Sequence, residues 1–193
     1  MSWAGKMTLS LTVSTAREIL ELWFSERVCP LWFNATPEFD QEIRERFVDV
    51  YRAAGAGALA DWEVTPAGAL ALVIVLDQLP LNMFRHQPES FAMEAAARRV
   101  AARAIARGFD SQLTDAQKTF LYLPYMHSED LSDQDESVAL YEKAGLEDSL
   151  NFARHHRELI RRFGRFPHRN AILGRESTAE ENAYLNSAEA FLG

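Results

Sequence analysis

The chain has 193 residues, of which 48% are hydrophobic and 25% charged, and its formal net charge is −8. These values are typical of a soluble globular protein, and we expect one domain over 1–193 whose first 13 residues are loosely ordered. The negative charge argues against nucleic acid as a partner, because phosphate backbones bind clustered Lys and Arg. The single cysteine, Cys29, excludes an internal disulfide and a thiolate metal cluster.

The N-terminal segment and the longest apolar run do not suggest export or membrane insertion. The opening "MSWAGKMTLSLTVS" carries one lysine and no long apolar core, which is not the pattern of a signal peptide. The longest apolar run, 67–76, is shorter than the roughly 20 residues that a membrane helix needs and predicts a buried helix. We therefore expect a cytoplasmic protein with no membrane partner.

Capping residues mark the predicted helix starts in the first third of the chain. Thr15 and Glu18 form a capping box ahead of Ile19 and its apolar neighbours. Thr36 precedes a proline at the first helical position and acids in the first turn, which predicts a second helix ending at Gly55.

The next helices are predicted from further caps and breaks. A Thr-Pro pair at 65–66 begins the apolar helix, which we expect to stop near Gln78 because Pro80 follows. A helix rich in Ala and Arg is predicted over 89–107, ending at Gly108.

The second half of the chain shows the same pattern of caps and breaks. Thr114 begins a helix that Pro124 is expected to end. Thr178 and Glu181 form another capping box. The remaining predicted helices are 133–143, 147–163 and 179–190.

No stretch shows the alternation of a strand, so the sequence predicts an all-α fold of about seven or eight helices. Most connections are short, which favours antiparallel neighbours. The long connections are predicted at 25–36, 79–88, 124–132 and 164–177. Long connections with aromatic and charged residues are often functional.

The first polar stretch is "LDQLPLNMFR", residues 76–85. Asp77 ends an apolar helix, where the helix dipole opposes a negative charge, so its carboxylate needs a cation or several donors. It is either a structural acid with partners or a ligand contact. Its polar neighbours Gln78, Asn82 and Arg85 are candidate binding residues.

The second polar stretch is "LPYMHSEDL", residues 123–131. His127 beside Glu129 and Asp130 is suited to acid–base chemistry, with His127 as general acid/base and a carboxylate to orient it. The alternative is a helix cap, in which Ser128 or Asp130 begins the helix near 133. No His-Glu-x-x-His spacing is present, and we predict no metal site.

The third polar stretch begins within the helix predicted over 147–163. The apolar stripe of this helix is formed by Phe152, Leu159, Ile160 and Phe163. His156 falls within this stripe and should point inward, whereas His155 lies off its edge. A buried histidine of this kind is either a hydrogen-bonded core residue or part of a site.

"FGRFPHRNAILGR", residues 163–175, follows that helix and carries Arg165, His168, Arg169, Asn170 and Arg175. The helix should end at a left-handed glycine, and the two phenylalanines should anchor the segment. Guanidinium groups bind carboxylates and phosphates through paired donors, so these residues are candidate anion contacts.

These three stretches resemble the signature stretches of a bacterial family known only as domain of unknown function 924, and the similarity extends from 19 to 178. The resemblance implies an all-helical, tetratricopeptide-like superhelical fold and implies no activity. The family pattern in the first stretch usually reads Asp-Gln-Phe-Pro-Arg-Asn, and here Leu81 stands where the arginine is expected. This difference implies weaker or altered ligand binding if that arginine contacts a ligand.

Three functional hypotheses follow. Burying an unpaired charge costs several kcal/mol, so the arginines need either nearby acids or an anion. We favour a polar pocket for a small anionic metabolite. The alternatives are an adaptor that binds an acidic peptide beside exposed aromatic residues such as Trp32 and Phe33, and a structural network of Arg, His and Asp. A glycine-rich phosphate loop and a Rossmann pattern are both missing, so no cofactor is predicted.

Overall fold

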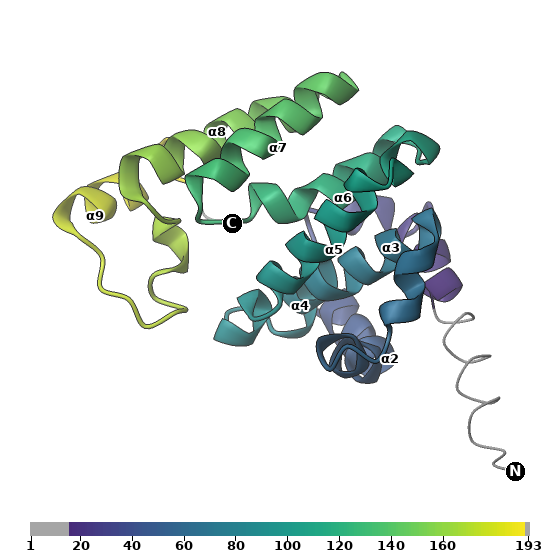
Figure 1. The fold of residues 1–193 in the computed structure, drawn as a ribbon. Coiled ribbons are helices and arrows are strands. Elements are labelled where there is room, and N and C mark those ends of the chain that lie inside the picture. Colours follow the sequence, from purple (N-terminus) through teal and green to yellow (C-terminus); the bar gives the residue numbers. More distant parts are fainter. Residues whose placement is uncertain (1–15, 192–193) are drawn as a thin grey trace, which may run out of the picture. The chain divides into compact units, whose positions relative to one another are not determined.

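The computed structural model describes residues 16–191, which form helices joined by turns and contain no strand. The all-α prediction is confirmed. The capping threonine Thr15 and the segment 1–13 lie outside the described residues. A helix at 16–23 is followed by α2 (Pro37–Gly55), α3 (Pro66–Val73), α4 (Leu79–Met83), α5 (Glu94–Ala106), α6 (Asp115–Met126), α7 (Leu131–Ala144), α8 (Glu147–Phe163) and α9 (Ala179–Leu185) (Figure 1).

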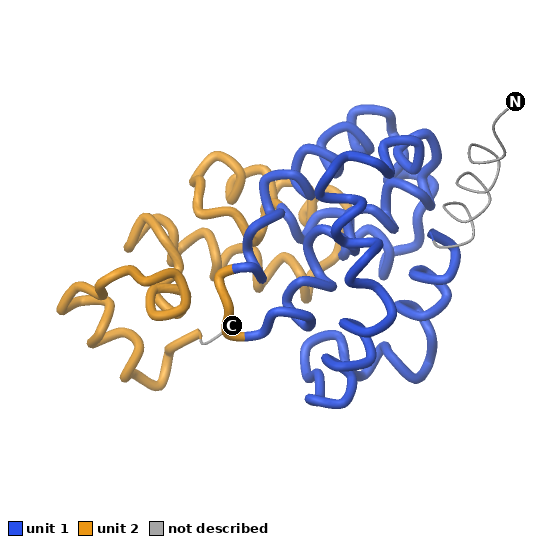
Figure 2. The backbone as a smooth tube through the Cα atoms, turned by 90° about the horizontal axis from the view of Figure 1, so that it is seen from below, with its two compact units in different colours: residues 1–85, 89–124 blue, residues 86–88, 125–193 orange. Residues whose placement is uncertain are grey.

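The chain divides into two compact units (Figure 2). Unit 1 comprises residues 1–85 and 89–124, and unit 2 comprises 86–88 and 125–193. Within unit 1, α2 packs against α4 and α3 packs against α5; within unit 2, α7 packs against α8. The single domain and the superhelical packing stay predictions.

The predicted caps begin the helices of unit 1. The hydroxyl oxygen of Thr36 accepts a hydrogen bond from the backbone N–H of Phe39, and that of Thr65 accepts one from the N–H of Gly68. A proline follows each threonine at the start of its helix, where its missing N–H costs nothing. The core of this unit includes Trp23 and Trp62, which are both buried.

The apolar helix does not stop near Gln78, contrary to the prediction. It continues through a π-helical segment, Ile74–Gln78, into α4. The backbone N–H of Leu79 donates to the carbonyl of Ile74, five residues back, and this wider turn accommodates Pro80 at the start of α4. The run Pro66–Met83 is long and apolar enough to cross a membrane by length and composition, but 83% of it is buried inside the protein. Burial of this kind is typical of a core helix.

Other predicted boundaries were wrong as well, including those of the helix expected at 133–143, which spans Leu131–Ala144 as α7. Helix α5 begins at Glu94 rather than 89, because Pro88–Phe91 forms a separate 3-10 turn. Helix α6 runs past Pro124 to Met126, and α9 ends at Leu185 rather than at 190. At the end of this longer α6, the buried amide of Gln134 on α7 donates to the carbonyls of Met126 and Ser128.

Unit 2 is a helical hairpin followed by an irregular segment and a short helix. The bounds of α8 are those predicted, and Gly164 ends it in the left-handed conformation, at φ 69°. The predicted capping box of Thr178 and Glu181 begins α9. The predicted anchor Phe166 is fully buried in a cluster with Leu159, Ile160 and Tyr184, and Phe163 packs against that cluster. Phe152, expected in the apolar stripe of α8, is 58% exposed, which corrects that assignment.

Candidate functional site

Arg165 is paired with a carboxylate of its own unit. Its Nε and Nη2 atoms donate to the two oxygens of Glu181 at 2.6 and 2.8 Å, and Nη2 also donates to the carbonyl of Glu176 at 2.8 Å. The hydrogen bond from Arg165 is the main reason why the pKa of Glu181 falls to about 2, with further help from Thr178 and Asn170. The same carboxylate accepts from the backbone N–H of Thr178 in the capping box of α9. Arg165 is therefore held by a buried structural acid.

Arg175 is paired with Glu129 in the same two-pronged way. Its Nη1 and Nη2 atoms donate to the Glu129 oxygens at 2.6 and 2.9 Å, and the backbone N–H of Phe166 donates to Oε1 at 2.8 Å. Burial alone would raise the pKa of Glu129, but the hydrogen bonds from Arg175 and Phe166 and the nearby arginine charges outweigh it and lower that pKa. Glu129 therefore ties the turn after α6 to the segment after α8.

Asn170 completes this framework. Its Oδ1 accepts from Nε of Arg175 at 3.0 Å, and its Nδ2 donates to the hydroxyl of Ser177 at 3.0 Å. Asn170 is only 1% exposed. The segment 164–177 is thus fixed by internal hydrogen bonds, in agreement with the anchoring predicted from its phenylalanines.

His156 points into unit 2, as predicted, and is 6% exposed. Its Nδ1 lies 2.8 Å from the carbonyl oxygen of Phe152, which can only accept, so Nδ1 carries the proton and Nε2 the lone pair. Burial lowers the pKa of His156 to about 3, and the charges of His127, His155 and Arg169 add to this effect against the opposing hydrogen bond. The ring is therefore neutral at physiological pH.

His168 lies close to the same aromatic side chains. Its ring centroid is 5.6 Å from that of Phe166 and 5.2 Å from that of Phe191, while His156 lies 5.4 and 4.6 Å from these two rings. Burial lowers the pKa of His168 to about 4; Arg169, His127 and Arg175 lower it further, and Glu129 opposes them. We call His156 and His168 with these two phenylalanines the histidine cluster.

Arg169 is a buried positive charge beside this cluster. It is 6% exposed, and its guanidinium carbon lies 4.6 Å from the centroid of the Phe166 ring, a cation–π arrangement. Its charge adds to the effect of burial and lowers the pKa of both His156 and His168.

The candidate residues of the first polar stretch belong to unit 1. Asp77 and Gln78 lie in the π-helical segment, are 2% and 3% exposed, and are joined by a 2.6 Å hydrogen bond from Gln78 Nε2 to Asp77 Oδ2. Asn82 and Arg85 both donate to the carboxylate of Asp40 in the first turn of α2. Asn82 of α4 and Arg85, two residues after that helix, thus hold this part of the chain against α2.

The residues of the second stretch have mixed roles. Asp130 caps α7 by accepting hydrogen bonds from the N–H and hydroxyl of Ser132, as the capping hypothesis predicted. His127 lies in the turn between α6 and α7, near enough to act on both imidazoles of the cluster. Within residues 16–191, no three His, Cys, Asp or Glu side chains are grouped so that they could hold a metal ion.

Sequence reasoning missed three partners. Glu181 was identified only as a helix cap, Asp40 only as a first-turn acid, and Phe191 not at all. The capping box was the one signal that marked Glu181 as a fixed carboxylate. For Asp40 and Phe191, nothing near them in sequence indicated their partners, which lie 42 and 23 residues away at Asn82 and His168.

Comparisons with known proteins agree with this description. Residues 19–189 match the family described as bacterial protein of unknown function, DUF924. The structure of a protein of unknown function from Agrobacterium tumefaciens is similar, with 38% sequence identity and a TM-score of 0.86, over 91% of this chain and 98% of that one. No curated protein matches the chain. The chain therefore belongs to the DUF924 family of bacterial proteins, whose function is unknown.

Proposed function

We propose that unit 2 binds a small anionic metabolite at the histidine cluster, with Arg169 as its main cationic contact. The observation that carries this proposal is the sign of the local charge. The protein carries a net charge of −8, yet the guanidinium charge of Arg169 lowers the pKa of both His156 and His168. At His168 the charge of Arg175 adds to this effect, and the carboxylate of Glu129 opposes it. A buried region of positive potential in an acidic protein attracts anions.

A second observation supports a ligand at this place. The Nδ1 atom of His168 is buried and has no hydrogen-bond partner among the described residues. Leaving a buried polar atom unsatisfied costs about 1–3 kcal/mol, so such atoms are uncommon in structural networks. A carboxylate or hydroxyl group of a metabolite would supply the missing partner.

The proposal assigns different roles to the arginines. Arg165 and Arg175 are engaged by Glu181 and Glu129, so with Asn170 they serve as a framework that holds Arg169 and His168 in place. We therefore assign these two arginines a structural role rather than direct contact with the anion. His127 is kept as the candidate general acid/base, since its charge acts on both imidazoles.

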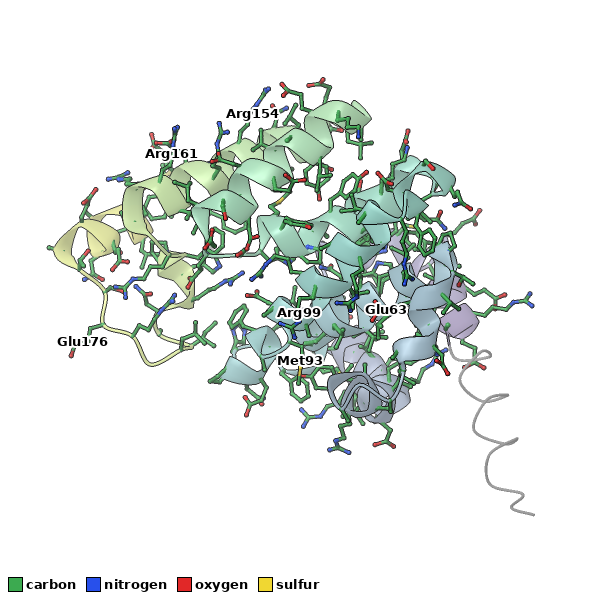
Figure 3. All side chains as sticks on the ribbon, in the orientation of Figure 1. Glu63, Met93, Arg99, Arg154, Arg161 and Glu176 are labelled. Carbon is green, nitrogen blue, oxygen red and sulfur yellow. The ribbon has the colours of Figure 1, made fainter. Side chains whose placement is uncertain are left out.

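The test is a set of thermal melts followed by circular dichroism, with citrate or with sodium chloride of equal ionic strength. At about a hundredfold excess over the dissociation constant, citrate should stabilise the wild type by about 2.7 kcal/mol. Arg169→Met should abolish this shift. The matched control is Arg161→Met, an exposed arginine on the outer side of α8 (Figure 3).

Two results would contradict the proposal. One is a wild-type midpoint that citrate does not move beyond the effect of chloride. The other is an equal citrate shift in Arg169→Met and Arg161→Met, which would place the anion away from Arg169.

One observation favours the adaptor alternative. Phe33 in unit 1 is 75% exposed, although its ring stacks on that of Phe120 at 6.2 Å. Exposed aromatic rings are common at protein interfaces. Binding of an acidic peptide that is lost in Phe33→Ala and kept in Arg169→Met would support this alternative over the metabolite.

A further inference from the structure

The ring of Phe191, close to the C-terminus, is surrounded by imidazoles. It contacts His156, His168 and His155 edge to face, with centroid distances of 4.6, 5.2 and 6.1 Å. It also packs against the apolar cluster that contains Phe166. A single side chain from the end of the chain therefore lies over both imidazoles of the histidine cluster.

The backbone that carries this ring is held by local hydrogen bonds. Helix α9 ends at Leu185, and after it the described chain forms only turns. Tyr184 accepts from the N–H and hydroxyl of Ser187 through its carbonyl and from the N–H of Phe191 through its hydroxyl, and Ser187 accepts from the N–H groups of Glu189 and Ala190. These bonds all lie within residues 184–191, so the segment can open without breaking a bond to α8.

The histidine cluster is the kind of place where such a cover has a purpose. An edge-to-face contact with a neutral imidazole suits an apolar ring and leaves the ring nitrogens without hydrogen bonds from Phe191. An anion would bond to Nδ1 of His168 and, once it is protonated, to Nε2 of His156, beside the guanidinium of Arg169. Phe191 and an anionic ligand therefore compete for one space.

We propose that residues 187–191 form a strap over the histidine cluster, and that a ligand reaches His156 and His168 only after Phe191 has moved away. The part that concerns a ligand rests on the proposed function, whereas the covering by Phe191 does not.

The strap can be tested without any ligand through the reactivity of each histidine. Diethyl pyrocarbonate modifies neutral imidazole, and peptide mapping gives the rate at each position. At pH 7, Phe191→Ala should raise the rates at His156 and His168 about tenfold, because local opening is no longer required. The exposed His86 serves as the internal reference, and Phe152→Ala, which removes an exposed ring one turn before His156, should change neither rate.

A milder variant keeps the test decisive if Phe191→Ala does not fold. Tyr184→Phe removes the hydroxyl that holds the Phe191 N–H but keeps the ring that packs on Phe163, and it should raise both rates by a smaller factor. Unchanged rates in both variants, or equal increases in Phe152→Ala, would overturn the strap.

Citrate then separates this inference from the proposed function. Citrate should bind Phe191→Ala more tightly than wild type, by a factor similar to the gain in reactivity. If the rates rise but citrate binds neither protein, the strap stands and the proposed ligand is wrong. If citrate binds both proteins equally while the rates stay unchanged, the ligand site stands and the strap is wrong.

Discussion

A shielded imidazole responds to both pH and ligands. Unit 2 contains a buried one, His156, and a half-buried one, His168, and both contact the rings of Phe166 and Phe191. His156 has its tautomer set by the carbonyl of Phe152, so its Nε2 is a hydrogen-bond acceptor of known position. His168 keeps its Nδ1 inside the fold without a protein partner. Both rings lie next to Arg169, whose charge disfavours a second positive charge. An anion would relieve this repulsion, and its binding should be accompanied by proton uptake.

The lowered histidine pKa values predict a loss of stability in mild acid. Above pH 6.5 the imidazoles are neutral in both the folded and the unfolded chain. Below it the unfolded chain takes up protons, while the folded protein does not until its pKa values of about 3 and 4 are reached. The free energy of unfolding should therefore fall between pH 7 and pH 5, by up to about 2 kcal/mol for each imidazole.

Urea denaturation at the two pH values measures this effect. The variant His156→Asn, whose amide does not titrate, should lose about half of the pH dependence. His155→Asn, which removes an exposed imidazole, should keep all of it. A free energy of unfolding that is the same at pH 5 and pH 7 would show that these rings are not buried as neutral groups.

Arg175 offers a second prediction at this scale. Arg175→Met leaves the Glu129 carboxylate, whose side chain is 27% exposed, with the N–H of Phe166 but without its cation. The expected cost is about 1–3 kcal/mol, between that of an exposed pair and that of a fully buried one. The double variant with Glu129→Gln should recover most of it. Arg154→Met, which breaks an exposed pair with Glu142, should cost less than about 1 kcal/mol.

At the scale of elements, helix starts were easier to predict than helix ends. A start is set by local chemistry: Thr36, Thr65 and Thr178 each cap their own helix through a hydrogen bond to a residue three positions on. An end depends on what the chain meets afterwards. Helix α6 passes Pro124 and ends at Met126, where Gln134 of the next helix donates to the carbonyls of Met126 and Ser128. A proline in the sequence therefore indicates that a helix is disturbed nearby, but it does not identify the residue at which the helix ends.

Gly68, at the start of α3, provides a test of close packing between elements. A Cβ atom at this position would lie 2.2 Å from the backbone carbonyl oxygen of Trp62, which cannot move independently. Gly68→Ala should therefore cost about 3 kcal/mol or more. In Gly55→Ala the new atom meets only the flexible end of Met93, at 2.8 Å, and the gain in helix propensity should make the change nearly neutral. Chemical denaturation of both variants makes the comparison, and equal costs would contradict it.

At the scale of the whole molecule, the sequence predicted the fold class and the family but not the pairing of charges. The composition of 163–175 showed that the arginines needed partners, but not which acids would supply them. Glu181 was missed because sixteen residues separate it from Arg165 and only the folded chain brings them together. The candidates Asn82 and Arg85 proved to share Asp40, which lies more than forty residues earlier.

The protein as isolated is predicted to contain no stoichiometric transition metal. His127, Glu129 and His168 offer mixed nitrogen and oxygen donors, but both oxygens of Glu129 accept hydrogen bonds from Arg175. A cation bound there would have to displace that guanidinium. Elemental analysis should find well below one metal ion per chain, and about one zinc, iron or manganese would reverse this view.

Because the chain forms two units, different spectroscopic signals report on the unfolding of different parts of the protein. Trp23, Trp32 and Trp62 lie in unit 1, and the sequence has no tryptophan after residue 62. Intrinsic tryptophan fluorescence therefore follows unit 1, whereas far-ultraviolet dichroism follows the helices of both units. If the two signals melt at one temperature, the units unfold as one cooperative system. If they separate, citrate should move the dichroism transition and leave the fluorescence transition in place, which would make the tryptophans a built-in control for binding to unit 2.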